Sequence, residues 1–287
     1  MSDKIDFKVD SVILICYTIK YDLGEGVDDM KLTSIASGSD GNCIFVGTQK
    51  TKFLVDCGIS AKRVEEGLKE LNLKVSDCDG ILITHEHTDH VKGLGVLSRR
   101  YGLPVFATGK TIDAVFAYKN LGKVDHGLFH SIEADHPFQI GDITIEASKI
   151  WHDAADPVCY SFRSGDVKAS IATDFGDYDE YLVEKLYGSD ILFVEANHDV
   201  NMLQVGPYPY YLKKRILGRK GHLSNERCAQ LISDIATKGT KKVYLGHLSK
   251  ENNYEKLAYQ TVRVSLHNEE LPLEVAKRDA VSSVTSI

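Results

Sequence analysis

The sequence predicts a single-domain α/β (α+β) protein, a four-layer αβ/βα sandwich in which helices cover the outer faces of two facing sheets. Two observations predict this class. Each half of the chain opens with short strand-like runs and then alternates strand and helix patterns. No linker-like stretch separates the two halves, so both are expected to contribute to one core rather than to two domains.

The first half opens with strands and turns before the first helix. Ser60 is placed to cap a helix whose apolar residues Val64, Leu68 and Leu71 fall at i, i+4 and i+7. Strands are expected at 31–36, 43–47, 52–56, 80–84 and 103–107, with further helices over 94–101 and 111–120.

The second half begins with short strands between 129 and 147 and then alternates in the same way. A hairpin of 158–163 and 167–173 turns at Ser164-Gly165-Asp166. The remaining expected elements are strands at 145–150, from 191, at 242–245 and near 272–276, and helices over 178–187, 225–236 and 253–267.

Composition and charge limit the class of protein. The 287 residues are 43% hydrophobic and 26% charged, as expected for a globular protein with a sizeable core. The net charge of −7 argues against a wide basic face that coats nucleic acid, although a local basic groove is compatible with it. Eleven histidines favour metal chemistry. Six scattered cysteines without a C-x-x-C pair, and no long apolar span, predict free thiols, a cytoplasmic location and no membrane insertion.

Residues 1–29 are expected to be an N-terminal extension to a domain of residues 30–287. The segment is acidic, and residues 23–29 have a linker-like composition, after which Met30 begins a clear strand pattern. The apolar run 12–17 lacks the basic residues and the cleavage site of a signal peptide. It is compatible with an added edge strand or with an upstream translated segment, and the sequence does not decide between them.

The densest chemistry lies in His85-Glu86-His87-Thr88-Asp89-His90, directly after the expected strand 80–84. Open α/β sheets place their reactive groups on loops at the C-terminal ends of buried strands. Imidazoles and carboxylates together suit hard to borderline divalent metals. A solvated polar loop is the plain alternative, but so many ligand-type side chains in six positions favour a metal site.

Three further ligand candidates each follow an expected strand, namely His152, Asp174 and His247. Because the C-terminal ends of neighbouring strands meet at one edge, these side chains are expected to converge with the histidine motif. Taken singly, His152 could be a satisfied core histidine and Asp174 a helix cap. The histidines without such a context are expected at the surface; they are His126, His130, His136 and His267.

A repeated tetrad supplies a candidate phosphate-binding residue. Gly-His-Leu-Ser occurs at 221–224 and again at 246–249, and His222 precedes a helix that Ser224 is expected to cap. Free N–H groups at a helix N-terminus attract anions, so His222 and Ser224 are candidates to meet a phosphate or a leaving group. A simple capping-region role for His222 is the open alternative.

Two more stretches could bind a nucleic acid backbone. The turn with Ser37, Ser39 and Asn42 offers hydroxyl and N–H groups to a phosphate, although a plain hairpin turn is the commoner explanation. Residues 208–220 combine tyrosines with cations in an acidic protein, a mixture that base stacking and phosphate contacts use. A solvated basic helix face would look similar. The cations of this stretch are Lys213, Lys214, Arg215, Arg219 and Lys220.

The ordered set of Asp56-Cys57-Gly58, the histidine motif, His152, Asp174 and His247 resembles the metallo-β-lactamase superfamily over nearly all of residues 30–250. The resemblance implies two divalent metal ions per chain, whose identity the ligands leave open among Zn, Mn and Fe. Asp174 would bridge the two metals, and Asp56 would orient the site. The ligands implied for one metal are His85, His87 and His152, and those for the other are Asp89, His90 and His247.

Two further resemblances concern the reaction. His222 and Glu195 match a Gly-His-Ser/Thr element and its glutamate in the tRNA 3′-processing endonucleases, which implies that the pair protonates a leaving oxygen. The chain also resembles the WalJ/YycJ-type hydrolases of Gram-positive bacteria. That resemblance implies 5′→3′ exonuclease-like activity on DNA and a link to cell division and cell-wall regulation. Its motifs are 37–43, 195–199, 206–209, 221–225 and 246–253.

The expected function is therefore hydrolysis of phosphodiester bonds, with DNA as the expected partner. Asp89 is an expected catalytic residue, and either Asp89 or Asp174 could orient the attacking water. One alternative on the same fold is a small-molecule metallo-hydrolase, such as a lactonase, a thioesterase or a cyclic phosphodiesterase. Another is a metal-bound binding module without turnover. The implied ligand set leaves coordination positions open for water, which argues against this alternative. A homo-oligomer is also compatible with the sequence.

Overall fold

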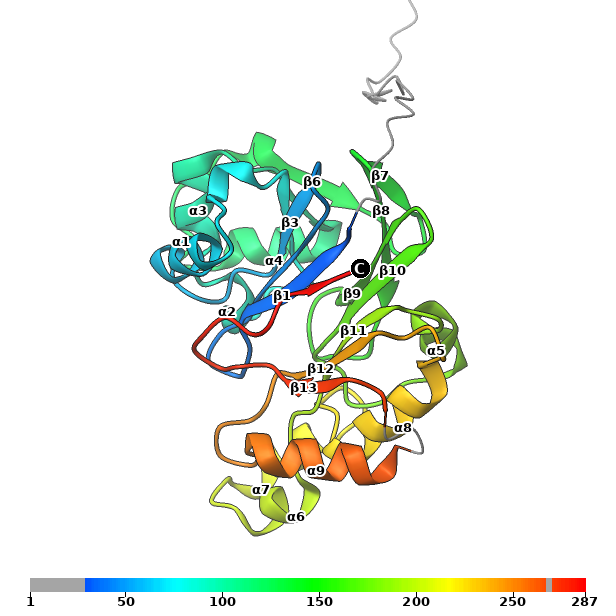
Figure 1. Ribbon diagram of the computed structural model, residues 1–287. Helices are drawn as coiled ribbons and strands as arrows, with labels where there is room; N and C mark the ends of the chain where they lie inside the picture. The colour runs from blue at the N-terminus through cyan, green and yellow to red at the C-terminus, as the bar shows by residue number, and fades with distance from the viewer. Residues whose placement is uncertain (1–28, 267–269) are drawn as a thin grey trace, which may run out of the picture.

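This computed structural model describes residues 29–266 and 270–287. Within these residues, two mixed sheets of seven strands face each other, and helices cover the outer face of each (Figure 1). The predicted single-domain four-layer αβ/βα sandwich is confirmed, since separate apolar clusters fill the spaces between successive layers. The extension expected at 1–29, with the alternatives for 12–17, lies almost wholly outside the described residues, so its boundary stays a prediction.

The first sheet has the strand order β14-β1-β2-β3-β4-β5-β6. Strands β3 to β6 are parallel, so their C-terminal ends share one edge. Ser60 caps α1 as predicted, by accepting a hydrogen bond from Arg63 N. The strands are β1 (Lys31–Ala36), β2 (Cys43–Gly47), β3 (Lys52–Val55), β4 (Gly80–Leu82), β5 (Val105–Thr108), β6 (Phe129–Ile132) and β14 (Thr285–Ser286). The helices on its outer face are α1 (Ala61–Glu70), α3 (Leu94–Tyr101) and α4 (Gly109–Ala117).

The second sheet has the order β13-β12-β11-β10-β9-β8-β7. Strands β10 to β13 are parallel, and β8 runs in the same direction because β9 is antiparallel to both β8 and β10. The strands are β7 (Phe138–Ile140), β8 (Ile143–Lys149), β9 (Val158–Ser164), β10 (Val167–Ala172), β11 (Ile191–Glu195), β12 (Lys242–Gly246) and β13 (Leu273–Val275). The helices on its outer face are α5 (Glu180–Leu186), α8 (Asn225–Ile235) and α9 (Glu255–Ser265).

Large side chains fill the space between the sheets and also fix the strand that leads into the histidine motif. The Tyr160 hydroxyl donates a hydrogen bond of 2.8 Å to Ile83 O, just after β4. Burial of each large apolar side chain contributes about 1.5–3 kcal/mol, so this layer holds the strand ends rigidly. The largest fully buried side chains here are Phe53, Tyr160, Phe162, Phe193 and Tyr244.

The structure contains short elements for which the sequence pattern predicts nothing. Helix α2 (Thr88–Val91) is a single turn inside the histidine motif, where polar side chains leave no apolar periodicity. Helix α6 (Val200–Val205) lies just before the tyrosine-rich stretch 208–220, and helix α7 (Tyr210–Ile216) lies within it. Strand β3 ends one residue early, because Asp56 adopts a left-handed φ of 60° that a strand cannot continue.

The described helices do not include one with the length and apolar character needed to cross a membrane. The five cysteines within the described residues are free and buried, in line with the predicted thiols.

Candidate metal centre

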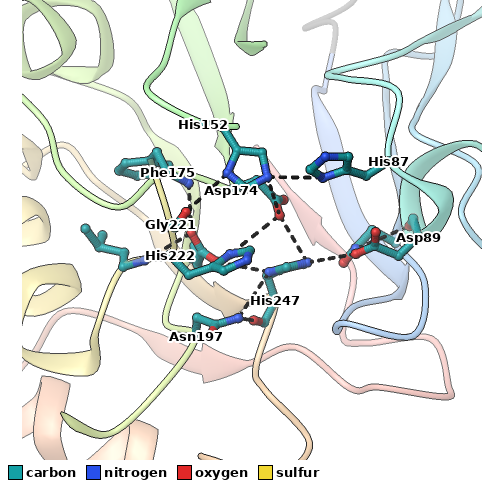
Figure 2. Close-up of polar contacts among 12 residues, drawn as sticks. His87, Asp89, His152, Asp174, Phe175, Asn197, Gly221, His222 and His247 are labelled. Carbon is teal, nitrogen blue, oxygen red and sulfur yellow. Dashed lines mark hydrogen bonds and ion pairs between the residues drawn. The ribbon is translucent and has the colours of Figure 1, made fainter. Parts of the chain in front are cut away.

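The ligand candidates come together at the C-terminal edges of the two sheets, as the strand-end argument predicts. Asp56 follows β3, and the histidine motif follows β4 in the first sheet. His152, Asp174 and His247 follow β8, β10 and β12 in the second sheet, and Figure 2 shows these three side chains pointing toward one another and toward the motif.

The first cluster consists of His85, His87 and His152, whose ring nitrogens lie within 4.8 Å of one another. His152 Nε2 lies 3.2 Å from His87 Nδ1. His85 is fully buried, and its Nε2 has no hydrogen-bond partner among the described residues. Burial lowers the pKa of His85 well below its usual value and keeps the imidazole neutral, which is the form that binds a metal. A buried, unpartnered nitrogen beside two other imidazoles fits a divalent metal.

The second cluster consists of Asp89, His90, Asp174 and His247, again with ligand atoms within 4.8 Å of one another. Asp174 lies between the clusters, since its oxygens are 3.2 Å from His90 Nε2, 3.4 Å from His247 Nε2 and 3.9 Å from His152 Nε2. Burial would lower the pKa of His90, but Asp174, Asp56 and Asp89 raise it well above its usual value. This local excess of negative charge is what a divalent cation would neutralise.

A layer of hydrogen bonds orients the ligands from behind. Asp56 Oδ2 accepts a bond of 2.7 Å from His90 Nδ1. Ser37 Oγ accepts one of 2.7 Å from His247 N, and Asn197 Nδ2 donates one of 2.9 Å to His247 O. Such partners fix the orientation of a ligand ring and typically matter for metal affinity by about 10- to 100-fold.

Three site residues have left-handed backbones although none is glycine. The φ angles are 60° at Asp56, 63° at Asp174 and 54° at His247. Such a conformation costs about 1–3 kcal/mol per residue and persists only where the surroundings impose it. In each case the turn follows the end of a strand and directs the side chain into the site, so two predicted ligands and the orienting residue Asp56 are held in a strained conformation.

His222 and Glu195 form the predicted pair beside the second cluster. His222 Nδ1 lies 2.7 Å from Glu195 Oε1, and the same oxygen lies 3.0 Å from His247 Nδ1. Burial would raise the pKa of Glu195, but His222 and His247 lower it to about 2, so this carboxylate is charged. The His222 side chain is 14% exposed, against 1% for His247, and therefore has the more open edge.

His222 and Glu195 also belong to a third group of possible ligands with Asp174 and His247. This group shares two members with the second cluster, and Glu195 approaches the Nδ1 atoms of both histidines. The proton-transfer role of the hydrogen-bonded pair stays a prediction, and metal analysis of a His222 variant distinguishes it from a third metal site.

Most of the candidate substrate residues in the turn 37–42 and the tetrad 221–224 have buried side chains. Ser37 and Asn42 are 2% exposed, and Asn42 bonds the Gly38 N–H and carbonyl groups, so both brace the site. Ser224 is 8% exposed and caps α8 by accepting from Arg227 N. Ser39 is exposed at the turn. Contact of these side chains with substrate stays a prediction.

The basic stretch borders the metal centre through helix α7. Arg215 forms a bidentate ion pair with Asp153, next to His152, with distances of 2.5 and 2.9 Å. The Arg219 guanidinium lies 3.1 Å from the centre of the Trp151 ring. Lys213 donates to Gln204 O at 2.7 Å, and Lys214 is exposed. Arg215 thus fastens α7 to the ligand loop, while Lys214 is left for other contacts.

Sequence reasoning left Glu86 of the motif without a role. In the structure, Glu86 Oε1 accepts a hydrogen bond of 2.8 Å from Ala155 N and so ties the first ligand loop to the loop that carries His152. The only sequence signal for this contact is that Glu86 lies between the two candidate ligands His85 and His87. The histidines expected at the surface are exposed at 126, 130 and 136, while His267 lies outside the described residues.

Gly58→Ala is expected to disturb the second cluster and destabilise the fold. A Cβ atom at Gly58 would lie 1.6 Å from Asp89 O, a backbone atom that cannot move without shifting Asp89 and His90. Overpacking of this kind costs about 1–3 kcal/mol or more. Metal analysis and thermal unfolding of Gly58→Ala should both show losses. Gly109→Ala is the control, because its Cβ would meet only the Ser131 hydroxyl at 3.3 Å. Equal metal content and Tm in the two variants would contradict this account of the turn.

Comparison with known proteins agrees with this geometry. A family model described as a β-lactamase superfamily domain matches residues 51–248. The chain is 44% identical to the exodeoxyribonuclease WalJ of Streptococcus pneumoniae serotype 2 strain D39 over 232 residues, covering 81% of this chain and 86% of WalJ. It is 42% identical to the exodeoxyribonuclease YycJ of Bacillus anthracis over 228 residues, covering 79% and 86%.

Solved structures share the fold. The metallo-β-lactamase fold protein YhfI of Bacillus subtilis has a TM-score of 0.68 with 17% identity, covering 91% of this chain and 100% of YhfI. The chain belongs to the β-lactamase superfamily. Within the superfamily, the predicted resemblance to the WalJ/YycJ-type hydrolases is confirmed by the two bacterial relatives.

Proposed function

We propose that this protein is a metal-dependent exodeoxyribonuclease that hydrolyses phosphodiester bonds of DNA, with the 5′→3′ polarity that the resemblance to the WalJ/YycJ-type hydrolases implies. The observation that carries the proposal is the position of Asp174 between the two ligand clusters, 3.2 Å from His90 and 3.9 Å from His152, beside a histidine–glutamate pair. Relatives with 42–44% identity are named exodeoxyribonucleases, which supports the same substrate class.

The ligand sets are suited to two divalent metals, and Zn, Mn and Fe all accept such sets. His85, His87 and His152 would hold one, and Asp89, His90 and His247 the other, with Asp174 shared. Metals held there would lower the pKa of a water molecule and neutralise the phosphate oxygens.

The protein groups have separate tasks in this scheme. Asp89 has a side chain that is 24% exposed, against 2% for Asp174, so it is the carboxylate of the second cluster best placed to orient the attacking water. His222 would donate the proton from Nε2 to the leaving oxygen, while the charged Glu195 carboxylate accepts a hydrogen bond from Nδ1.

Helix α7 supplies a surface for the DNA strand. Tyr210 and Tyr211 are 79% and 75% exposed, and Lys214 lies on the same short helix. Exposed aromatic rings with neighbouring cations suit single-stranded nucleic acid, because every base offers a face for stacking and every phosphate a negative charge. The cytoplasmic location and a homo-oligomer stay predictions.

The double variant Lys213→Ala/Lys214→Ala is expected to slow DNA hydrolysis and to leave hydrolysis of a small phosphodiester unchanged. Loss of the Lys214 phosphate contact should reduce the salt slope of log(kcat/KM) on single-stranded DNA by about 0.7, and by about 1.4 when Lys213, which also donates to Gln204 O, contacts a phosphate too. The assay compares single- and double-stranded DNA, RNA, bis(p-nitrophenyl) phosphate, a lactone and a thioester. Arg215 is left intact because it braces Asp153.

The control variant is Lys238→Ala/Lys241→Ala, which removes two exposed charges just before β12, at the opposite end of that strand from His247. Turnover of the lactone or the thioester, with no release of nucleotides from DNA, would favour a small-molecule hydrolase instead.

A further inference from the structure

A concave site adjoins the metal centre on the side of His247. Its volume is about 440 Å³, within the range of about 300–1,000 Å³ that small-molecule sites occupy. Ser37 and Leu248 are among its lining residues. Leu248 directly follows His247, and Ser37 Oγ accepts the hydrogen bond from His247 N. The walls of this pocket are thus continuous with the structure that holds a candidate ligand.

The topology explains why this pocket is cationic. Strands β12 and β13 are parallel neighbours, so the segments that leave them emerge side by side, and α9 begins next to both. The first segment supplies Lys250, the start of α9 supplies Lys256, and the segment after β13 supplies Arg278. Glu255 is the acidic residue among the lining side chains.

Two of these cations have no partner within the described residues. Arg278 is held in place, since Nη2 donates a hydrogen bond of 2.7 Å to Leu248 O and Nη1 lies 3.6 Å from Asp40 Oδ2. The exposed ammonium groups of Lys250 and Lys256 make neither a hydrogen bond nor an ion pair in residues 29–266 and 270–287. Three cations around one pocket, in a chain with a net charge of −7, are suited to a phosphate group.

An aromatic ring completes the pocket. Tyr254 lines it and is 54% exposed, so one part of the side chain belongs to the pocket while another remains open to solvent. A nucleobase stacks on such a ring without requiring a particular sequence.

We infer that the pocket of Lys250, Tyr254, Lys256 and Arg278 binds one nucleotide unit, with the phosphate against the cations and the base against Tyr254. The nucleotide belongs either to the substrate strand, next to the bond that is cleaved, or to a free nucleoside monophosphate. For the strand, the inference rests on the proposed nuclease function; for the free nucleotide it does not.

The test uses the full chain with Lys250→Ala/Lys256→Ala, leaving Arg278 intact because it braces Leu248. On a single-stranded oligonucleotide, KM is expected to rise by about tenfold or more, with kcat unchanged, since two charge-assisted phosphate contacts are lost. The salt slope of log(kcat/KM) should fall by about 1.4. Lys238→Ala/Lys241→Ala carries the same charge change and is expected to behave as wild type. Tyr254→Ala should also raise KM, and an unchanged KM in that variant would remove the base from the inference.

Two further probes distinguish a nucleotide of the substrate strand from a free nucleotide, and a failure of the pocket from a failure of the nuclease proposal. Hydrolysis of bis(p-nitrophenyl) phosphate should be the same in all these variants, because this small diester needs only the metal centre. The affinity for dAMP, measured by calorimetry, should fall in the lysine double variant if the pocket accepts a free nucleotide. A raised KM on the oligonucleotide with an unchanged dAMP affinity would show that the pocket binds a nucleotide of the substrate strand. Unchanged KM and unchanged dAMP affinity together overturn the pocket. A third outcome is that the wild-type protein does not cleave DNA, yet binds dAMP more tightly than the lysine double variant does. This result would overturn the nuclease proposal and retain the pocket as a nucleotide site.

Discussion

Asp174→Asn is expected to remove most bound metal and to lower the rate of DNA hydrolysis by about a thousandfold or more. Asparagine has nearly the same shape and tolerates the left-handed backbone at φ 63°, so the turn after β10 should survive. The substitution removes a negative charge that faces both clusters, at 3.2 Å from His90 Nε2 and 3.9 Å from His152 Nε2. Elemental analysis and nucleotide release, measured on the same preparation, check this result.

Asp166→Asn is the matched control for that experiment, because Asp166 is exposed in the hairpin turn between β9 and β10. It is expected to keep wild-type metal content and rate. Circular dichroism and thermal unfolding of both variants separate a loss of ligand from a loss of fold. A folded Asp174→Asn protein with normal metal content and rate would rule out a shared ligand at this position.

His222→Ala is expected to keep its metal and to lose about 100- to 10,000-fold in kcat on DNA, the usual contribution of a positioned general acid. Its Nδ1 is 2.7 Å from the charged Glu195 carboxylate, and the side chain has the exposed edge that a leaving group could reach. Glu195 is a less suitable target, because its Oε1 is also 3.0 Å from His247 Nδ1 and its removal would disturb a ligand.

The choice of leaving group makes this experiment specific for proton donation. The alkoxide released from DNA needs a proton, whereas p-nitrophenolate leaves without one. His222→Ala should therefore hydrolyse bis(p-nitrophenyl) phosphate at nearly the wild-type rate. Equal losses on both substrates, or loss of metal, would assign His222 to the metal centre instead. The exposed His136→Ala is the control for removal of an imidazole.

The convergence of the ligand candidates could be predicted because their positions in the sequence combine two kinds of regularity. The histidine motif is dense in sequence, and the other candidates each follow an apolar run that forms a strand. Parallel strands must bring their C-terminal ends to one edge, so sequence order alone indicates that His152, Asp174 and His247 meet. Asp174 lies within 3.9 Å of His152 and within 3.4 Å of His90 and His247, which agrees with that expectation.

The supporting contacts could not be predicted, since they join segments with no common pattern. Glu86 reaches Ala155 across the two ligand loops, and Arg215 reaches Asp153 from a helix of seven residues. Ser37 has the composition of a phosphate-binding turn, yet its hydroxyl accepts from His247 N, about two hundred residues away in sequence. Only the folded chain determines which donor a buried hydroxyl meets.

Helix α2 could not be predicted from the sequence for a related reason. The single turn α2 has His90 and Val91 on its buried side and no apolar repeat, so its conformation depends on packing against Cys57 and Gly58 rather than on propensity. The left-handed backbone conformations at the strand ends likewise depend on the surrounding structure, and no sequence pattern predicts them.

The most direct test of the central claim is the release of nucleotides from DNA as metal is returned to chelated protein. We expect no release from the metal-free chain and full activity when about two equivalents of Zn, Mn or Fe per chain are bound. Asp174→Asn should regain little activity at any metal concentration. Full DNA hydrolysis by metal-free protein, or no hydrolysis after two metals are bound, would contradict a binuclear nuclease centre at these clusters.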